Sequence, residues 1–201
     1  MLDTRLHRAS KVAIPDRREI NTDMAGTDRT MLGIEQRELL FDRLAVTQDE
    51  GMTWRILASS VPIAPDAIHT EGKPDRSRTY DTWDGFPHER DLLVEQAGAR
   101  GGNVISLAGD RHVFLAAEFG QREGGAESSP AIREFLGSGI SSGVAGLDPE
   151  PRAPISFSHR LNGVSLVELN SNGASVEFWG CNAADPRSTP SLVRRFEFDS
   201  D

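Results

Sequence analysis

An aspartate and a histidine stand two positions apart in the segment Gly109-Asp110-Arg111-His112. The segment follows residues 103–108, a run of apolar and β-branched residues with the length and composition of a buried strand. Side chains two apart at a strand end can point the same way, and a carboxylate with an imidazole suits hard or borderline metal ions. The alternative is a chance pair that caps a turn. Because α/β and α+β proteins place their chemistry after buried strands, the position favours a candidate metal or phosphate site.

A second acidic group lies in the segment Asp81-Thr82-Trp83-Asp84-Gly85-Phe86-Pro87. Asp81 and Asp84 are three positions apart, next to two aromatic residues and directly before a predicted helix, so they can bind a cation. The simpler interpretation is that Asp84 caps the helix that Pro87 begins, which is a common use of aspartate. On these residues alone, we prefer the cap.

The segments that must position these groups are a few apolar runs separated by polar loops. Helices are predicted over 34–46, where Leu40 and Leu44 share a face, and over 87–98. Asn172-Gly173 predicts a hairpin turn, because both residues tolerate positive φ. Strands are predicted at 53–61, 103–108, 113–119, 132–136, 164–169 and 175–179. Long loops are predicted at 62–82 and 120–129, and the second loop is expected to be mobile. The tail at 193–198 alternates weakly between apolar and polar residues. The pattern predicts an α+β fold with a mixed β-sheet and flanking helices.

The composition excludes several classes of protein. At 201 residues the chain fits one domain, and its formal charge of −9 argues against non-specific nucleic-acid binding. Cys181 is the single cysteine, so an internal disulfide and a thiolate metal cluster are both excluded. The sequence contains no apolar run long enough to span a bilayer and no apolar core of a signal peptide near Met1. As written, the chain is expected in the cytoplasm.

Taken together, these motifs resemble the C-terminal part of PhoD-like alkaline phosphatases. The resemblance covers nearly the whole chain, and its motifs are specific in combination. The segments that carry it are Leu2-Asp3-Thr4-Arg5-x-x-Arg8, Leu32-Gly33-x-x-Gln36, Asp81–Pro87 with Arg90, and Gly109–His112. It implies the C-terminal half of a four-layer αββα metallophosphoesterase domain. It also implies an enzyme that uses calcium and iron to hydrolyse phosphate mono- and diesters, acting as an alkaline phosphatase or phosphodiesterase.

The resemblance assigns roles to five residues of this chain. Asp84, Asp110 and His112 match the family's metal site, and Asp110 and His112 also match its catalytic element. In that role a metal polarises the phosphoryl oxygen and activates a water, while imidazole binds phosphate or moves a proton. Arg5 and Arg8 match family arginines, for which phosphate binding and a structural salt bridge are both open.

The family's first metal-binding half has no counterpart in residues 1–201. We therefore expect weak or absent hydrolysis by this portion alone, and export to the periplasm or medium if a further N-terminal part carries a signal. The alternative function is a non-catalytic fragment or interaction domain that docks on a separate N-terminal half. We also expect a poorly protected sheet face near Val104, Ile105 and Leu107, and self-association through it.

Overall fold

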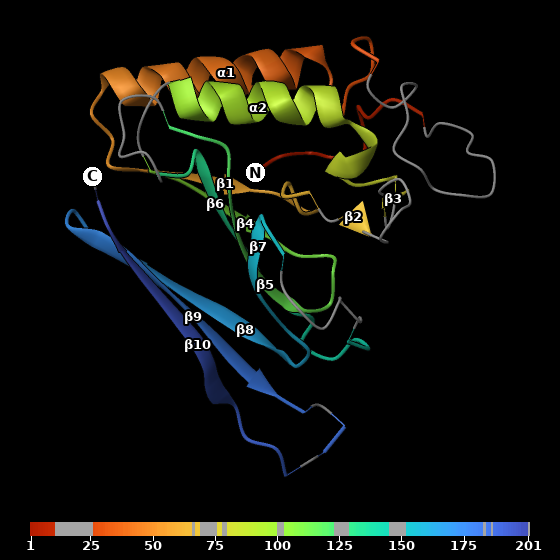
Figure 1. Cartoon of the computed structure of the whole chain (residues 1–201), viewed down its shortest axis with the longest axis vertical. Coiled ribbons are helices and arrows are strands. Elements are labelled where there is room, and N and C mark those ends of the chain that lie inside the picture. Colours follow the sequence, from red (N-terminus) through yellow and green to blue (C-terminus); the bar gives the residue numbers. More distant parts are fainter. Residues whose placement is uncertain are drawn as a thin grey trace.

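The computed structural model describes residues 1–10, 26–65, 67–68, 76–77, 80–99, 103–122, 129–144, 152–182, 184–185 and 187–200. These residues form three layers: two helices, a five-stranded mixed sheet, and a three-stranded antiparallel sheet (Figure 1). The predicted α+β class is therefore confirmed. No helix in this part of the chain has the length and apolar character needed to cross a membrane.

The five-stranded sheet is the middle layer and carries the predicted site. Its strands, in spatial order, are β1 (Trp54–Ala58), β4 (Asn103–Ala108), β6 (Ile132–Leu136), β5 (Phe114–Phe119) and β7 (Ile155–His159). Strands β1, β4 and β6 run parallel to one another, and β5 is antiparallel to both of its neighbours. The carboxyl ends of the three parallel strands consequently lie at the same edge of the sheet.

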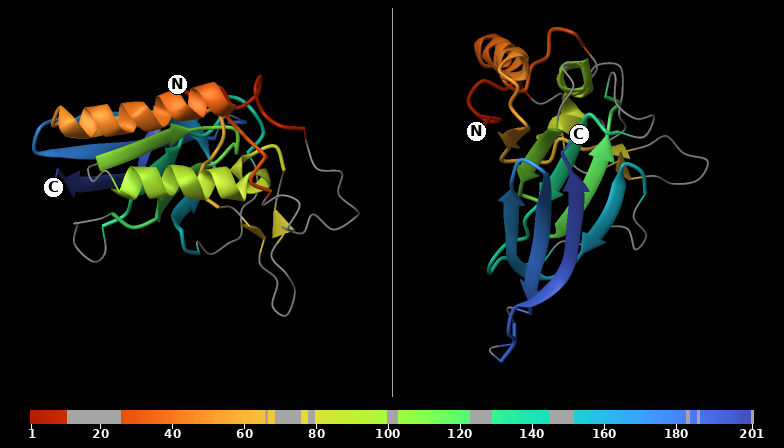
Figure 2. Two further views of the ribbon diagram at one scale, coloured as in Figure 1. Left: turned by 90° about the horizontal axis from the view of Figure 1, so that it is seen from above. Right: turned by 90° about the vertical axis from the view of Figure 1, so that its left-hand side faces the viewer.

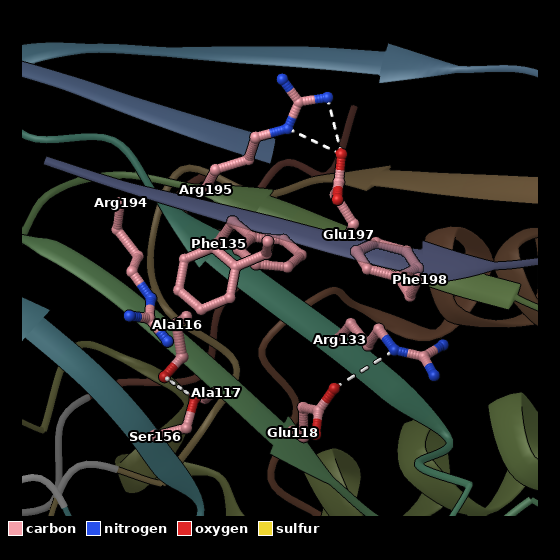
Figure 3. Close-up of a pocket in the computed structure, with 11 residues that line it drawn as sticks. Ala116, Ala117, Glu118, Arg133, Phe135, Ser156, Arg194, Arg195, Glu197 and Phe198 are labelled. Carbon is pink, nitrogen blue, oxygen red and sulfur yellow. Dashed lines mark hydrogen bonds and ion pairs between the residues drawn. The ribbon is translucent and has the colours of Figure 1, made fainter. Parts of the chain in front are cut away.

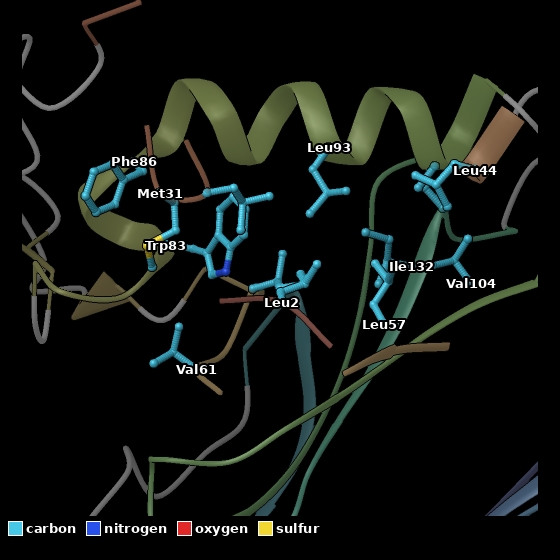
Figure 4. Packing of buried hydrophobic residues seen from close by; sticks show 14 residues of the cluster. Leu2, Met31, Leu44, Leu57, Val61, Trp83, Phe86, Leu93, Val104 and Ile132 are labelled. Atoms are coloured by element: carbon cyan, nitrogen blue, oxygen red, sulfur yellow. The ribbon is translucent and has the colours of Figure 1, made fainter. Parts of the chain in front are cut away.

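Helices α1 (Ile34–Asp49) and α2 (Pro87–Ala99) cover one face of this sheet (Figures 1 and 2). Helix α2 begins at Pro87, where the missing N–H of proline removes no helical hydrogen bond. The helices and the sheet enclose an apolar cluster that includes the fully buried Trp83 and Leu93, together with Val104 and Ile132 from the sheet (Figure 4). This cluster fixes the position of the segment before α2, because Trp83 is part of it.

The second sheet packs against the opposite face. It consists of β8 (Asn162–Leu169), β9 (Gly173–Cys181) and β10 (Ser191–Asp199), in the order β10-β9-β8. The layer between the two sheets is aromatic: the ring of Phe178 lies 4.9 Å from that of Phe114 and 6.3 Å from that of Phe135. Aromatic pairs at such distances add to the stability that burial alone provides.

The N-terminal residues extend the edge of the five-stranded sheet. The backbone N–H of Leu2 donates to the Ala58 carbonyl at 2.8 Å. The Gln36 side chain makes two reciprocal hydrogen bonds with the backbone of Asp3, at 2.7 Å to its N–H and 2.9 Å to its carbonyl. Two of the segments that carried the family resemblance are therefore in direct contact.

The predicted helices and strands are confirmed, with differences in detail. The first helix continues to Asp49, and the weakly alternating tail forms β10. Strand β7 was not predicted. The loop predicted at 62–82 contains the short strands β2 (Ala67–Ile68) and β3 (Arg76–Ser77), and the 3₁₀ turn η1 (Trp83–Gly85) follows it directly. The mobility predicted for 120–129 concerns residues that lie mainly outside the described ones.

The predicted hairpin is present, but the reason given for its turn is wrong. Leu169 pairs with Ala174, which leaves a loop of residues 170–173, and neither Asn172 nor Gly173 has a positive φ. The Asn170 side chain instead closes the loop by accepting the backbone N–H groups of Asn172 at 2.8 Å and Gly173 at 3.1 Å. An asparagine that mimics a backbone turn thus replaces the left-handed pair.

The expectation of an exposed sheet face near Val104, Ile105 and Leu107 is also wrong. Val104 is buried among the helices, and Ile105 is buried between the two sheets. Leu107 is partly buried and packs against the aromatic layer. Both faces of β4 are covered, because successive residues of a strand point to opposite faces and each face has its own layer.

Candidate functional site

The turns that follow β1, β4 and β6 meet at the carboxyl edge of the sheet. They comprise residues 59–65, 109–113 and 137–144. The N–H of Ser59 donates to the Leu107 carbonyl at 2.9 Å, and the N–H of Gly137 donates to the Ala108 carbonyl at 3.0 Å. The backbone ladder therefore continues into the turns and holds their first residues next to one another.

Asp110 and His112 both have left-handed backbone conformations, with φ values of 72° and 53°. Among the described residues they are the two non-glycine residues with positive φ, and both are exposed. Such conformations cost of order 1–3 kcal/mol each and occur most often at functional sites. The Asp110 carboxylate makes no hydrogen bond or ion pair within the part of the chain that the structure describes, so it is available to a ligand.

One nitrogen of His112 is fixed by the turn after β6. The Nδ1 atom lies 2.9 Å from the carbonyl oxygen of Gly143. A carbonyl can only accept, so Nδ1 carries the hydrogen in this contact, and the neutral ring keeps its lone pair on Nε2. This arrangement prepares Nε2 to bind a metal or to accept a proton.

Asp84 lies in η1, directly before α2, and is buried. Its carboxylate forms an ion pair with Arg90 of α2, with 2.7 Å between Oδ1 and the guanidinium NH1. The ion pair offsets part of the free energy that it costs to remove the Asp84 carboxylate from water. Asp84 is therefore engaged with a cation of the protein itself, and its assignment as a metal ligand stays a prediction.

Arg5 and Arg8 both contact Asp81. The Arg8 guanidinium donates to the Asp81 carbonyl at 2.7 Å, and the Arg5 guanidinium lies 3.8 Å from the Asp81 carboxylate. These contacts connect the N-terminal segment to the loop before η1 and agree with the structural alternative. Phosphate binding by the two arginines stays a prediction.

Sequence analysis missed Glu134, a fully buried carboxyl group on β6. It accepts hydrogen bonds from the backbone N–H groups of Ile63 and Ala64, each at 2.7–2.8 Å to its nearer oxygen, and from the Ser106 hydroxyl at 2.8 Å. Burial raises the pKa of Glu134 to about 7, against the opposing effect of these hydrogen bonds and of Arg90. Glu134 thereby fixes the turn after β1 to the two central strands.

The metal-binding capacity of these residues is limited. Within the described residues, no group of three or more histidine, cysteine, aspartate or glutamate side chains could hold a metal ion together. Asp110 and His112 provide one oxygen and one nitrogen donor of suitable chemistry. The donors fit a metal of the kind the fold family implies, but they are fewer than a complete site requires.

Replacing Asp110 with glycine tests whether its carboxylate serves the fold or a ligand. We expect the free energy of unfolding to stay within about 1 kcal/mol of the native value, because glycine removes the left-handed strain and adds only unfolded-chain entropy. The measurement is urea unfolding, with Asp110→Ala as the control that retains the strain. A larger loss in the glycine variant would show that the carboxylate supports the fold.

The fold and the family comparison define the class of protein. A purple acid phosphatase from yellow lupin seeds superposes with a TM-score of 0.55 over 83% of this chain and 28% of its own, at 13% identity, so it shares the metallophosphoesterase fold. The model of the PhoD-like phosphatase family matches residues 1–175. The chain belongs to that family, a family of phosphoester hydrolases.

Two relatives show how much of the family's proteins this chain represents. Alkaline phosphatase D of Bacillus subtilis (strain 168) is 29% identical over 149 residues, which cover 74% of this chain and 25% of the relative. The solved structure of PhoD superposes over 100% of this chain and 39% of its own, with a TM-score of 0.80 and 22% identity. The chain thus spans a quarter of the curated relative and about two fifths of the solved structure.

Proposed function

We propose that this chain supplies Asp110 and His112 to the metal centre of an enzyme that hydrolyses phosphate mono- and diesters. The observation that carries the proposal is the pair of left-handed residues at the carboxyl edge of parallel strands, with a free carboxylate and an oriented imidazole. Membership of the PhoD-like family supports the same chemistry. Calcium and iron are the metals that the resemblance implies.

Each residue has a distinct role in this proposal. The Asp110 carboxylate binds the cation, and Nε2 of His112 binds it or holds the proton that the leaving group takes. When bound, the metal polarises the phosphoryl oxygen and lowers the pKa of a water molecule. Asp84, as the third predicted ligand, would have to exchange its contact with Arg90 for the cation.

The second candidate is a non-catalytic or docking role for the chain on its own. The scarcity of metal-binding groups among the described residues favours it, because two donors do not make a complete centre. The two candidates are compatible if a further polypeptide supplies the remaining ligands. We expect the 201-residue chain alone to be weak or inactive.

The first test is hydrolysis of bis(p-nitrophenyl) phosphate by the purified chain, with calcium and ferric iron added. We expect no turnover above the metal-only background, and strong turnover would contradict the incomplete centre. The DNA upstream of Met1 then separates the alternatives: an in-frame continuation with early aspartates and a histidine supports one polypeptide, and a stop codon supports a separate partner.

Once the remaining ligands are supplied, the assignment of individual residues can be tested. Asp110→Asn and His112→Asn are each expected to lower kcat roughly 100-fold or more, because the first removes the carboxylate that binds the cation and the second removes the imidazole that binds the cation or holds the leaving group's proton. Asp91→Asn and His159→Asn are matched controls on α2 and β7 and should retain activity. Equal activity in all four variants would place the chemistry elsewhere.

A further inference from the structure

The two sheets are joined in different ways on their two sides. On the β10 side, a groove of about 360 Å³ separates β10 from the five-stranded sheet (Figure 3). On the β8 side, hydrogen bonds connect the two layers. The Trp54 indole N–H at the start of β1 donates to the Asn170 carbonyl, directly after β8, at 2.6 Å. At the other end of β8, the Gly163 N–H donates to the Gly139 carbonyl in the turn after β6 at 3.3 Å. Strand β8 is therefore attached at the edge of the sheet that carries the candidate site.

Asn162, the first residue of β8, makes the closest polar contacts with that turn. The residue is 8% exposed, and its side-chain NH₂ group donates to the carbonyl of Gly139 at 2.9 Å and to that of Ser142 at 2.7 Å. Both partners are carbonyl oxygens, which only accept, so the amide nitrogen rather than the amide oxygen must face them. One buried side chain thus holds two carbonyl groups of the same turn.

The turn and the start of β8 approach each other closely because both contain glycine. A Cβ atom at Gly139 would lie 1.9 Å from Oγ of Ser142, so a larger residue would push the turn open. A Cβ atom at Gly163 would lie 2.0 Å from the carbonyl oxygen of Trp179 on β9. Glycine at these two positions lets the turn close on itself and lets Asn162 reach both carbonyl groups.

The same turn contacts the candidate site one residue further along the chain. Gly143 follows Ser142, and its carbonyl oxygen lies 2.9 Å from Nδ1 of His112. A single peptide unit therefore separates the carbonyl that Asn162 holds from the carbonyl that accepts the imidazole hydrogen. Because His112 is exposed, packing does little to fix its ring, and the direction of the Gly143 carbonyl determines which ring nitrogen carries the hydrogen.

We propose that Asn162 is a positioning residue for His112. It holds the turn after β6 so that the Gly143 carbonyl keeps the hydrogen on Nδ1 and leaves the lone pair on Nε2. The inference rests on the proposed function, since the role given there to His112 requires a lone pair on Nε2. Without the contacts of Asn162, the ring can take the other tautomer, in which Nε2 carries the hydrogen and cannot bind a cation.

The test is the tautomer of His112 in the 201-residue chain without added metal, measured from the nitrogen-15 chemical shifts of the ring at a pH at which the imidazole is neutral. The His112→Asn spectrum identifies the His112 signals among those of the five histidines. We expect the Nδ1–H form to predominate in the native chain. Asn162→Asp keeps the shape of the side chain but places a second acceptor against two carbonyl groups. It should lower the ratio of the Nδ1–H to the Nε2–H form roughly fivefold to tenfold, as expected for the loss of one neutral hydrogen bond.

Asn170→Asp is the matched control, because it makes the same substitution directly after the other end of β8. The Asn170 side chain accepts the backbone N–H groups of Asn172 and Gly173, and an aspartate can accept them equally well. This variant should leave the His112 tautomer ratio unchanged. The ring of His88, on α2, should give the same tautomer ratio in all variants.

Thermal melting shows whether each variant is folded. If Asn162→Asp does not fold, Asn162→Ala removes the two donors without adding a charge, and it should lower the ratio in the same direction. A folded Asn162→Asp or Asn162→Ala chain with the native ratio would overturn the inference. Because the measurement needs neither substrate nor metal, its outcome is separate from that of the hydrolysis tests. An unchanged ratio refutes the positioning role alone, and full activity of His112→Asn in the completed enzyme refutes the proposed function.

Discussion

Replacing Glu89 with alanine is expected to lower the free energy of unfolding by about 3–5 kcal/mol, because it removes one partner of a buried charged network. Glu89 lies in the first turn of α2 and is 1% exposed. Its carboxylate accepts the Thr30 hydroxyl at 2.7 Å and the backbone N–H groups of Met31 and Leu32, and it lies 3.5 Å from the Arg37 guanidinium. Alanine would leave the N–H groups of the buried Met31 and Leu32 without this acceptor.

The measurement is urea unfolding followed by far-ultraviolet circular dichroism. Glu89→Gln retains one acceptor oxygen, and we expect it to lower the free energy of unfolding by about 1–3 kcal/mol. Glu95→Ala, on the exposed side of the same helix, is the control and should change stability by less than about 0.5 kcal/mol. If Glu89→Ala loses no more than Glu95→Ala, the carboxylate does not connect residues 30–32 to the helix as described.

The sequence predicts the elements of this fold well where local patterns are strong. Strand β4 has the predicted bounds, and α2 begins at Pro87, because a β-branched apolar run and a proline each act through local geometry. Strand β7 was missed because its apolar residues, Ile155 and Phe157, alternate with serines over only five positions. The position of β7 in the sheet is determined by its pairing with β5. That pairing joins separate segments of the chain, so the local sequence of β7 does not reveal it.

The candidate site was predictable in residue type and position, but not in geometry. Asp110 and His112 follow a recognisable buried strand, whereas their left-handed backbone and the contact of His112 with Gly143 come from the packing of separate turns. The buried carboxylates of Glu89 and Glu134 were not recognised, because a charged residue beside apolar ones is typical of a solvated face. The Glu134 carboxylate accepts a hydrogen bond from the backbone N–H of Ile63, which lies 71 positions away in the sequence.

The free energy of unfolding of this chain should also depend on pH through Glu134. Its other carboxyl groups add their own pH dependence to that of Glu134. The pKa of Glu134 is about 7 in the folded protein and takes the ordinary value of 4.5 in the unfolded chain, because burial disfavours the ionised form. Below pH 4.5 the group is protonated in both states, and its contribution to stability is complete. Between pH 4.5 and 7 the unfolded chain releases its proton first, so this contribution is lost as the pH rises.

The expected loss is about 3 kcal/mol, from an interval of about 2.5 pH units at about 1.4 kcal/mol per unit. Glu134→Gln does not titrate, and its amide can accept the backbone N–H groups of Ile63 and Ala64 while donating to the Ser106 hydroxyl. The stability of Glu134→Gln relative to the native chain should therefore rise by about 3 kcal/mol between pH 4.5 and 7, and stay constant above.

Urea unfolding of both proteins at intervals from pH 4.5 to 8 provides this difference directly, since contributions from all other carboxyl groups cancel. Glu118→Gln serves as the control on the neighbouring strand β5, where the side chain is 57% exposed. Its difference from the native chain should show little dependence on pH. If the Glu134→Gln difference is equally flat, the buried carboxyl must be ionised throughout this range. Its hydrogen bonds, together with the nearby charge of Arg90, must then outweigh the cost of burial.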